Sequence, residues 1–225
     1  MHKTLLLIFA IFTFQLAYAD YTTDCLKGKK HSTACQNMLK RYWKYNDLIE
    51  KIGQEEGVDP SLLKALIAYE SAYKAQARSP ADAKGLTQVI PGTAKQHGVN
   101  NSQYLYTPEI SIRTGAKELA KLWKMFGRLD LTLAGYNAGP GAVKKYGYKV
   151  PPYRETTAYV KNIGKLYQEF KIAEQKKNYK GVTAQVSHAF YTQPAEIKAK
   201  KTSKPKLVQV KNSHRPSAFR TVIAN

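Results

Sequence analysis

The chain has 225 residues with 36 Lys or Arg and 16 Asp or Glu, which gives a formal net charge of +20. A balance this basic favours a polyanionic neighbourhood such as cell wall, membrane surface or nucleic acid, although a basic surface that only aids solubility fits equally well. No second long apolar segment follows residue 19, which argues against a protein with several membrane spans.

Residues 1–19 have the pattern of a secretory signal peptide. Lys3 supplies the positive start, residues 5–16 are almost wholly apolar, and Ala17-Tyr18-Ala19 is a small-x-small cleavage site. The apolar run is shorter than the about 20 residues that span a bilayer. We therefore expect a periplasmic or secreted protein without a stable membrane anchor, and an uncleaved anchor is the alternative.

Residues 20–44 form an N-terminal segment that holds Cys25 and Cys35, the only two cysteines. In an exported chain, two cysteines this close in sequence favour a disulfide, which would contribute about 2–3 kcal/mol. Two free thiols are the alternative. The spacing fits no common metal site and no pair of histidines accompanies it, so we expect neither a metal nor a cofactor.

The next segment, residues 45–170, is predicted to be one mainly α-helical domain. A first helix is expected from Asn46 or Asp47 to Glu56. Asp59-Pro60 combines a capping residue with a proline at the first helical position and predicts a second helix. Thr107-Pro108 repeats this signal before a long helix.

Two more helices complete this domain. One is expected over residues 130–138, ended by Gly139, and one runs from about Glu155 to Phe170 with apolar residues three and four apart. Only a short extended segment near residues 86–90 fits a strand, so the predicted fold class is mainly α.

Residues 171–225 are predicted to be a basic, largely disordered tail. They hold 12 basic and 2 acidic residues, a net charge of +10, and few aliphatic ones. Residues 20–170 hold 23 basic and 14 acidic residues, a net charge of +9. Within the tail, only residues 182–191 have a composition that could order, against a partner.

Glu70 is the first candidate for catalysis. It follows Leu63, Leu66 and Ile67 by seven, four and three residues, so on a helix it extends their core-facing stripe. A carboxyl removed from water has a raised pKa, as a general acid near neutral pH requires. A Glu at a helix end that leans into water fits the periodicity equally well.

Three later patches offer groups that bind sugars. Gln88 follows the turn at Gly85 and offers a donor and an acceptor, while Tyr136 and Asn137 offer a ring and an amide where small residues end a helix. Glu155 and Tyr159, four apart, share a helix face. The alternatives are an ordinary turn, a plain helix stop, and a solvated Glu beside a core Tyr.

The four patches, in this order and at these spacings, resemble the soluble lytic transglycosylases with the goose-type-lysozyme-like fold. That family carries Glu-Ser, Gly-Leu-Met-Gln followed by Pro and Thr-Ala, Ala-Tyr-Asn-Ala-Gly, and Pro-Tyr-x-Glu-Thr-x-x-Tyr-Val. Here the motifs read Glu70-Ser71, Gly85-Leu86-Thr87-Gln88 with Pro91 and Thr93-Ala94, Gly135-Tyr136-Asn137-Ala138-Gly139, and Pro152-Tyr153-Arg154-Glu155-Thr156-Thr157-Ala158-Tyr159-Val160. The resemblance covers roughly residues 45–170.

The resemblance implies a lytic transglycosylase that cleaves the MurNAc–GlcNAc β-1,4 bond of peptidoglycan and forms 1,6-anhydroMurNAc. Glu70 would be the only catalytic acid and base. The residues that orient it or hold the sugars would be Ser71, Gln88, Tyr136, Asn137, Glu155 and Tyr159. Two departures from the family, Thr87 in place of Met and Gly135 in place of Ala, are expected to affect substrate preference, Thr87 as one wall of the cleft.

A mechanism with one acid also agrees with the carboxylates that the sequence lacks. Between Ser71 and Arg154 the only acidic residues are Asp82, Glu109, Glu118 and Asp130, none of them in a recognisable pairing motif. The N-acetyl group of the substrate can serve as the nucleophile instead of a second carboxylate.

Two alternatives stay open: a hydrolytic muramidase on the same fold, and a non-catalytic wall-binding assembly factor. Nucleic acid is not expected as a partner. The family includes members that open the wall locally for a secretion or conjugation apparatus, and the basic tail would be the contact with such a complex.

Overall fold

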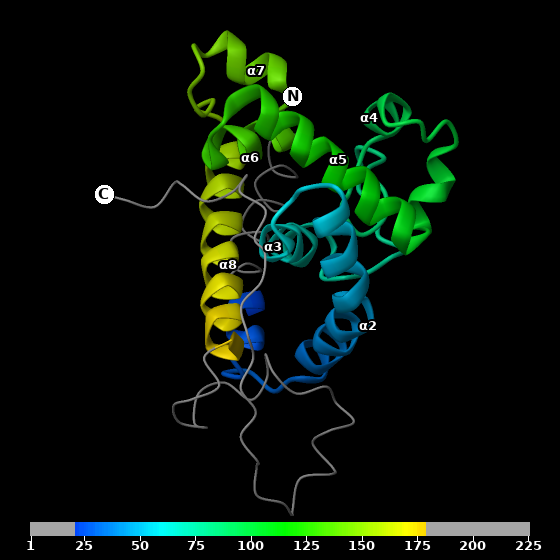
Figure 1. Ribbon diagram of the computed structural model, residues 1–225, viewed down its shortest axis with the longest axis vertical. Coiled ribbons are helices and arrows are strands. Elements are labelled where there is room, and N and C mark those ends of the chain that lie inside the picture. The colour runs from blue at the N-terminus through cyan, green and yellow to red at the C-terminus, as the bar shows by residue number, and fades with distance from the viewer. Residues whose placement is uncertain (1–20, 179–225) are drawn as a thin grey trace, which may run out of the picture.

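The computed structural model describes residues 21–178, which form α-helices around one main core (Figure 1). The mainly α fold class is confirmed: residues 21–178 contain no strand, only isolated bridges from Lys84 to Arg78 and to Val89. The predicted signal peptide, and the predicted tail from residue 179 onward, lie outside the described residues. None of the described helices is long and apolar enough to cross a bilayer.

Helix α2 (Thr33–Glu55) begins well before the predicted start at Asn46 or Asp47. Its N-cap is Ser32, whose side chain accepts a hydrogen bond from the backbone N–H of Cys35, while Asn46 and Asp47 bond to one another inside the helix. The predicted start was wrong because Ser32 and the pair Asn46 and Asp47 can all cap a helix. Which of them begins the helix depends on which residues are buried.

The N-terminal segment belongs to the main core. A disulfide joins Cys25, in a helical turn over residues 21–26, to Cys35 in α2, with 5.4 Å between their Cα atoms. Both cysteines and Leu26 are fully buried in the same cluster as the central helices. Residues of the range 21–44 therefore pack into the main core.

Helix α3 (Pro60–Ser71) begins as predicted, and the Asp59 carboxylate accepts a hydrogen bond from the Ser61 N–H at 2.8 Å. Residues 61–68 are buried, because α3 packs against α2 and α8. It ends where Ala72 and Tyr73 adopt left-handed backbone angles, with φ of 49° and 60°. Tyr73 is fully buried, and its hydroxyl donates to the carbonyl of Lys64 at 3.0 Å.

The remaining helices surround this central element. The second half of the domain contains α5 (Pro108–Phe126), α6 (Leu129–Ala138) and α8 (Arg154–Asn178), close to the predicted positions. Three short elements were not predicted, because five or six residues carry too little periodicity: α4 (Pro91–Gln96), the 3₁₀ helix η1 (Ser102–Tyr106) and α7 (Pro140–Lys145).

Helix α8 extends eight residues beyond the end predicted at Phe170, to Asn178. Polar contacts to the start of α3 hold this extension: Lys171 pairs with Asp59 at 3.1 Å, and Ser61 Oγ donates to Glu174 at 3.2 Å. The composition changes at residue 171, but the helix continues because those contacts lie on α3.

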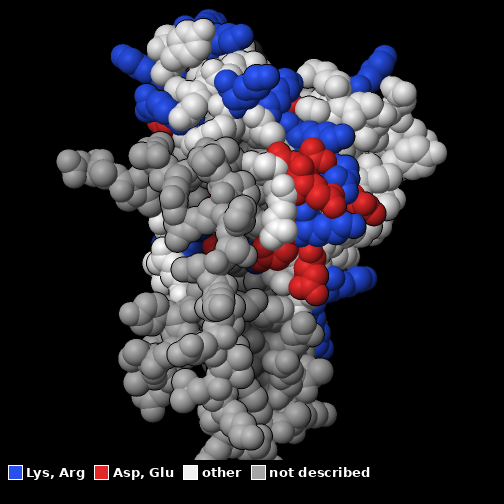
Figure 2. All heavy atoms as spheres, in the orientation of Figure 1, with Lys and Arg blue, Asp and Glu red and all other residues white. Residues whose placement is uncertain are grey.

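Ion pairs also join α2 to α5. Arg113 of α5 contacts Glu55 and Glu56, each at 2.8 Å, and Glu109 at 3.3 Å. Figure 2 shows acidic and basic side chains interleaved on this face of the molecule. Opposite charges here are therefore paired across the two helices.

The loop between α3 and α4 is wedged against α5 by Thr87, which is fully buried. Its hydroxyl donates to the Ser111 carbonyl at 2.7 Å, and its backbone N–H donates to Ser111 Oγ at 3.2 Å. A Cβ on Gly115 would lie 2.6 Å from the Thr87 Cβ. The expectation that Thr87 forms one wall of a cleft is wrong, because its side chain is used for packing.

We predict that Gly115→Ala destabilises the domain by about 1–3 kcal/mol, the usual cost of overpacking. Gly164→Ala is the matched control, since Gly164 lies in α8 with nothing within 4 Å of the added Cβ. That variant should be more stable by up to about 1 kcal/mol from helix propensity. Urea unfolding of both variants measures the difference, and equal gains in stability would show that Thr87 does not constrain Gly115.

Candidate active site

Glu70 is the penultimate residue of α3 and is partly buried, directly after the fully buried Leu66 and Ile67. Burial raises the pKa of its carboxyl from 4.5 to about 8, with a smaller contribution from the negative charge of Glu155. The C-terminal end of a helix also disfavours a negative charge. Glu70 is therefore a neutral acid at pH 7, as a proton donor must be.

Tyr159 of α8 contacts Glu70 directly. Its hydroxyl donates a hydrogen bond to Oε1 of Glu70 at 2.5 Å, and this bond opposes the rise in the pKa of Glu70. Burial, and then the charge of Glu70, raise the pKa of Tyr159 well above its ordinary value, so the phenol keeps its proton. The ring of Tyr69 packs edge-on against it at 5.2 Å. Tyr159 thus orients the carboxyl of Glu70 through one of its oxygens.

Tyr136 of α6 lies close enough to Glu70 for the charge of Glu70 to affect the phenol. Burial, and then the charge of Glu70, raise the pKa of the Tyr136 phenol well above its ordinary value. Its hydroxyl donates to the backbone carbonyl of Thr87 at 2.9 Å. Tyr136 therefore joins α6 to the loop beside the acid.

A chain of side-chain hydrogen bonds connects the end of α6 with the start of α8. Thr156, which is 1% exposed, donates to Oδ1 of Asn137 at 2.7 Å. Nδ2 of Asn137 in turn donates to Oε1 of Glu155 at 3.4 Å. These bonds orient the Asn137 amide and hold the exposed carboxylate of Glu155 near Glu70.

Ser71 and Gln88 hold the loop between α3 and α4 in place. The Ser71 hydroxyl is buried within hydrogen-bond distance of the carbonyls of Leu86 (2.8 Å) and Ile67 (3.2 Å). The amide nitrogen of Gln88 donates to the carbonyls of Gly85 at 2.9 Å and Ala77 at 3.1 Å. Both residues position the segment that follows Glu70 by binding backbone.

The sequence patches thus come together around one carboxyl, with unequal parts. Tyr159 touches Glu70, the charge of Glu155 acts on Glu70, and the charge of Glu70 in turn acts on Tyr136. Sequence reasoning assigned no role to Tyr69 or Thr156, since no local pattern marks a helix residue that contacts a partner on another helix. Among residues 21–178, no group of three or more His, Cys, Asp or Glu could hold a metal ion.

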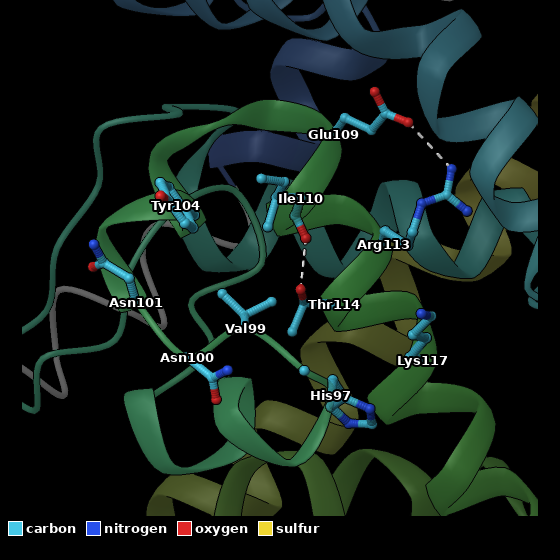
Figure 3. A pocket seen from close by; sticks show the side chains of 11 residues that line it. His97, Val99, Asn100, Asn101, Tyr104, Glu109, Ile110, Arg113, Thr114 and Lys117 are labelled. Carbon is cyan, nitrogen blue, oxygen red and sulfur yellow. Dashed lines mark hydrogen bonds and ion pairs between the residues drawn. The ribbon is translucent and has the colours of Figure 1, made fainter.

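A cavity of about 450 Å³ lies between α5 and the segment around η1, and Glu70 is not part of its lining (Figure 3). Several of its charged groups already pair with protein groups: Arg113 with the three glutamates of α2 and α5, and His97 with Glu118 at 2.6 Å. This cavity is separate from the acid and its partners.

We predict that two variants shift the pKa of Glu70 in opposite directions. Tyr159→Phe removes a donor to the carboxylate and should raise that pKa above about 8. Glu155→Gln removes a negative charge and should lower it. Carboxyl NMR titration measures both, with Glu109→Gln as a control that leaves Glu70 unchanged. Shifts of the same sign in the first two variants would contradict this account.

Glu70 should also make the folded domain less stable as pH rises. Its folded-state pKa is about 8 against 4.5 ordinarily, so from pH 4.5 to 8 the unfolded chain binds fewer protons than the folded one. The free energy of unfolding therefore falls with pH over this window. Glu70→Gln should be more stable than wild type by a few kcal/mol at pH 8, at about 1.4 kcal/mol per pKa unit, and nearly equal at pH 4. Urea unfolding at both pH values measures this difference, and a constant one would refute the buried acid.

Comparison with known proteins agrees with this fold. Residues 47–157 match the transglycosylase SLT domain. The soluble lytic murein transglycosylase of Escherichia coli K12 is 31% identical over 139 residues, covering 53% of this chain and 22% of that protein. The chain thus spans about a fifth of the length of this curated relative.

Two solved structures have a similar fold. Lytic transglycosylase Slt from Pseudomonas aeruginosa, in an inactive form with Gln in place of Glu, has 30% identity and a TM-score of 0.51, covering 58% of this chain and 24% of that one. The 70 kDa soluble lytic transglycosylase from Escherichia coli has 27% identity and a TM-score of 0.52, covering 68% and 26%. Residues 47–157 are therefore a transglycosylase SLT domain, and the helical fold that contains them is the lysozyme-like fold of these solved structures.

Proposed function

We propose that this chain is a peptidoglycan lytic transglycosylase, a glycosidic bond lyase that cleaves between MurNAc and GlcNAc and leaves a 1,6-anhydroMurNAc end. The observation that carries the proposal is Glu70, a carboxyl that is neutral at pH 7 and bonded to Tyr159. The Pseudomonas aeruginosa relative is inactive with Gln in place of Glu, which supports an essential glutamate in this family.

The first step uses Glu70 as the acid. Its carboxyl gives its proton to the glycosidic oxygen, the bond from C1 of MurNAc to that oxygen breaks, and GlcNAc leaves with a new 4-hydroxyl. The carbonyl oxygen of the MurNAc N-acetyl group attacks C1 and forms an oxazolinium ion. Glu70 is now a carboxylate, and the hydrogen bond from Tyr159 stabilises it.

The second step uses the same residue as the base. Glu70 takes the proton of the C6 hydroxyl of MurNAc, O6 attacks C1, and the bond from C1 to the N-acetyl oxygen breaks. The product is the 1,6-anhydro ring, Glu70 is protonated again, and no water is consumed. A carboxyl with a pKa near the working pH suits both transfers.

The partners of the other carboxylates support a mechanism with one acid. The acidic residues between Ser71 and Arg154 each pair with a cationic or titratable side chain: Asp82 with Arg78 and Lys84, Glu109 with Arg113, Glu118 with His97 and Lys121, and Asp130 with Arg128. Among residues 21–178, the carboxylate whose charge acts on Glu70 is Glu155. In a hydrolytic muramidase, the alternative function, Glu155 would be the base that activates water.

The residues around Glu70 take supporting parts in this proposal. Tyr136, Asn137 and Glu155 hold the sugars, and Tyr159 orients the acid. Ser71 and Gln88 keep the loop in place through its backbone carbonyls.

We predict that Glu70→Gln loses at least about 10²–10⁴-fold in cleavage of purified sacculi, the usual worth of general acid catalysis. The variant stays folded, because Gln removes the cost of a buried carboxyl. Mass spectrometry of wild-type products should find anhydro-muropeptides. Reducing ends that disappear in Glu155→Gln would establish the muramidase, and no products at all would leave a wall-binding assembly factor.

The setting is also a proposal. The signal-peptide pattern of residues 1–19 supports export to the periplasm or beyond. There the enzyme would open the wall locally for a secretion or conjugation apparatus, with the basic residues 171–225 as the contact. A comparison of secretion or conjugation efficiency in cells with Glu70→Gln and with a chain truncated after Asn178 separates the part of the enzyme from that of the tail.

A further inference from the structure

The end of the molecule that carries α7 exposes tyrosines and lysines side by side. The tyrosine–lysine patch consists of Lys144, Lys145, Tyr146, Tyr148, Lys149 and Tyr153, all of them exposed. The three tyrosines are 36%, 55% and 41% exposed and are among the few large apolar side chains at the surface. Figure 2 shows Lys and Arg gathered at this end, which is the top of Figure 1.

The charge of this patch is not balanced. Residues 139–154 contain four basic residues and no acidic one. None of Lys144, Lys145 and Lys149 has a carboxylate partner within the part of the chain that the structure describes, whereas Lys64 pairs with Glu50. The patch is therefore complementary to an anionic ligand.

The tyrosine rings of the patch are held in place. Tyr146 packs edge-on against Tyr153 at 5.5 Å, and Tyr148 packs edge-on against Phe126 at 6.3 Å. Phe126 in turn packs against a small core cluster of Leu131, Ala134 and Val143. An ordered ring with an exposed surface offers an apolar face and a hydroxyl to a ligand at low entropic cost. Stabilisation of the C-terminal end of α7 explains Lys144 and Lys145 but neither Lys149 nor the tyrosines.

The patch continues from the candidate site. Tyr153 precedes α8 directly and stands two residues before Glu155, which receives the hydrogen bond from Asn137. A glycan strand bound at Glu70 has sugar rings with apolar faces, and its peptide stems carry free carboxylates. These are the two chemistries that the tyrosines and the lysines recognise.

We propose that the tyrosine–lysine patch binds the part of the glycan strand that extends beyond Glu70, the lysines taking the carboxylates of its peptide stems. The chain therefore prefers strands with stems over strands stripped of them. The proposal rests on the proposed function and deepens it. An anionic membrane is the competing partner, but α7 has only six residues and forms no amphipathic helix that could lie in an interface.

The test compares two triple variants that remove the same charge. One changes Lys144, Lys145 and Lys149 to Gln, and the control changes Lys29, Lys40 and Lys95, which are exposed on other elements. Cleavage is measured on glycan strands with stems and on strands stripped by an amidase. The patch variant should raise KM roughly tenfold on strands with stems and clearly less on stripped strands, which keep only the lactyl carboxylate of each MurNAc; kcat should not change, and the effect should shrink in high salt. The control variant should change neither substrate.

Tyr148→Ser separates the contact with sugar rings from the binding of stem carboxylates. It should raise KM on both kinds of strand, because both contain sugar rings. Equal losses on both strands from the lysine variant, or the same loss from the control, overturn the proposal. If the wild type cuts neither strand, the proposed function fails. The patch is then tested alone, by measuring how Glu70→Gln binds to stem-bearing strands with and without the patch lysines. Lysine-dependent binding to vesicles of phosphatidylglycerol and phosphatidylcholine, without an effect on strands, would replace the glycan with a membrane.

Discussion

The burial of α3 is the constraint on which the site depends. A helix whose residues 61–68 are all buried has to end inside or beside the core, and here it ends with Glu70. A carboxyl in that position loses water, which favours its neutral form. A hydrogen-bond donor stabilises the ionised form, and Tyr159 of α8 supplies one. The packing of α3 against α8 therefore sets the acidity of Glu70.

The loop after α3 carries the second constraint. Ala72, Tyr73 and Gln88 have left-handed backbone angles that non-glycine residues seldom adopt, and such strain persists only where the surroundings hold it. The side chain of Tyr73 is buried in the core, and the amide of Gln88 donates hydrogen bonds to two carbonyls of the loop. Thr87 locks the same loop onto Gly115. The strained backbone of this loop lowers the stability of the domain, and it keeps the groups around Glu70 in fixed positions.

The charges of the domain divide into two kinds of surface. On the face between α2 and α5, Arg113 pairs with glutamates and stabilises the packing of two helices. At the end with α7, lysines that have no carboxylate partner among residues 21–178 stand among exposed rings. Like charges without partners repel one another and lower the stability of the fold. Such a surface is therefore better explained by the binding of an anion than by folding.

What the sequence by itself determined was local. Asp59-Pro60 and Thr107-Pro108 predicted the starts of α3 and α5, because a cap and a proline act within one turn. The spacing of Glu70 from Leu63, Leu66 and Ile67 left a core-facing and a solvated carboxyl equally open, and the resemblance of the four motifs to a known family identified it as the acid. Local signals failed at Ser32 and Asn46, which have similar capping ability, and at Phe170, where α8 continues.

Only the tertiary structure decided the parts that the other residues play. Ser71 and Gln88 were expected to serve Glu70 or the sugars, yet their hydrogen bonds go to backbone carbonyls. Thr87 was expected to line a cleft and is instead packed on Gly115. The hydrogen bond from Tyr159 to Glu70 joins residues 89 positions apart. Such contacts depend on how helices pack, and no pattern within a single helix specifies which side chain from another helix it will meet.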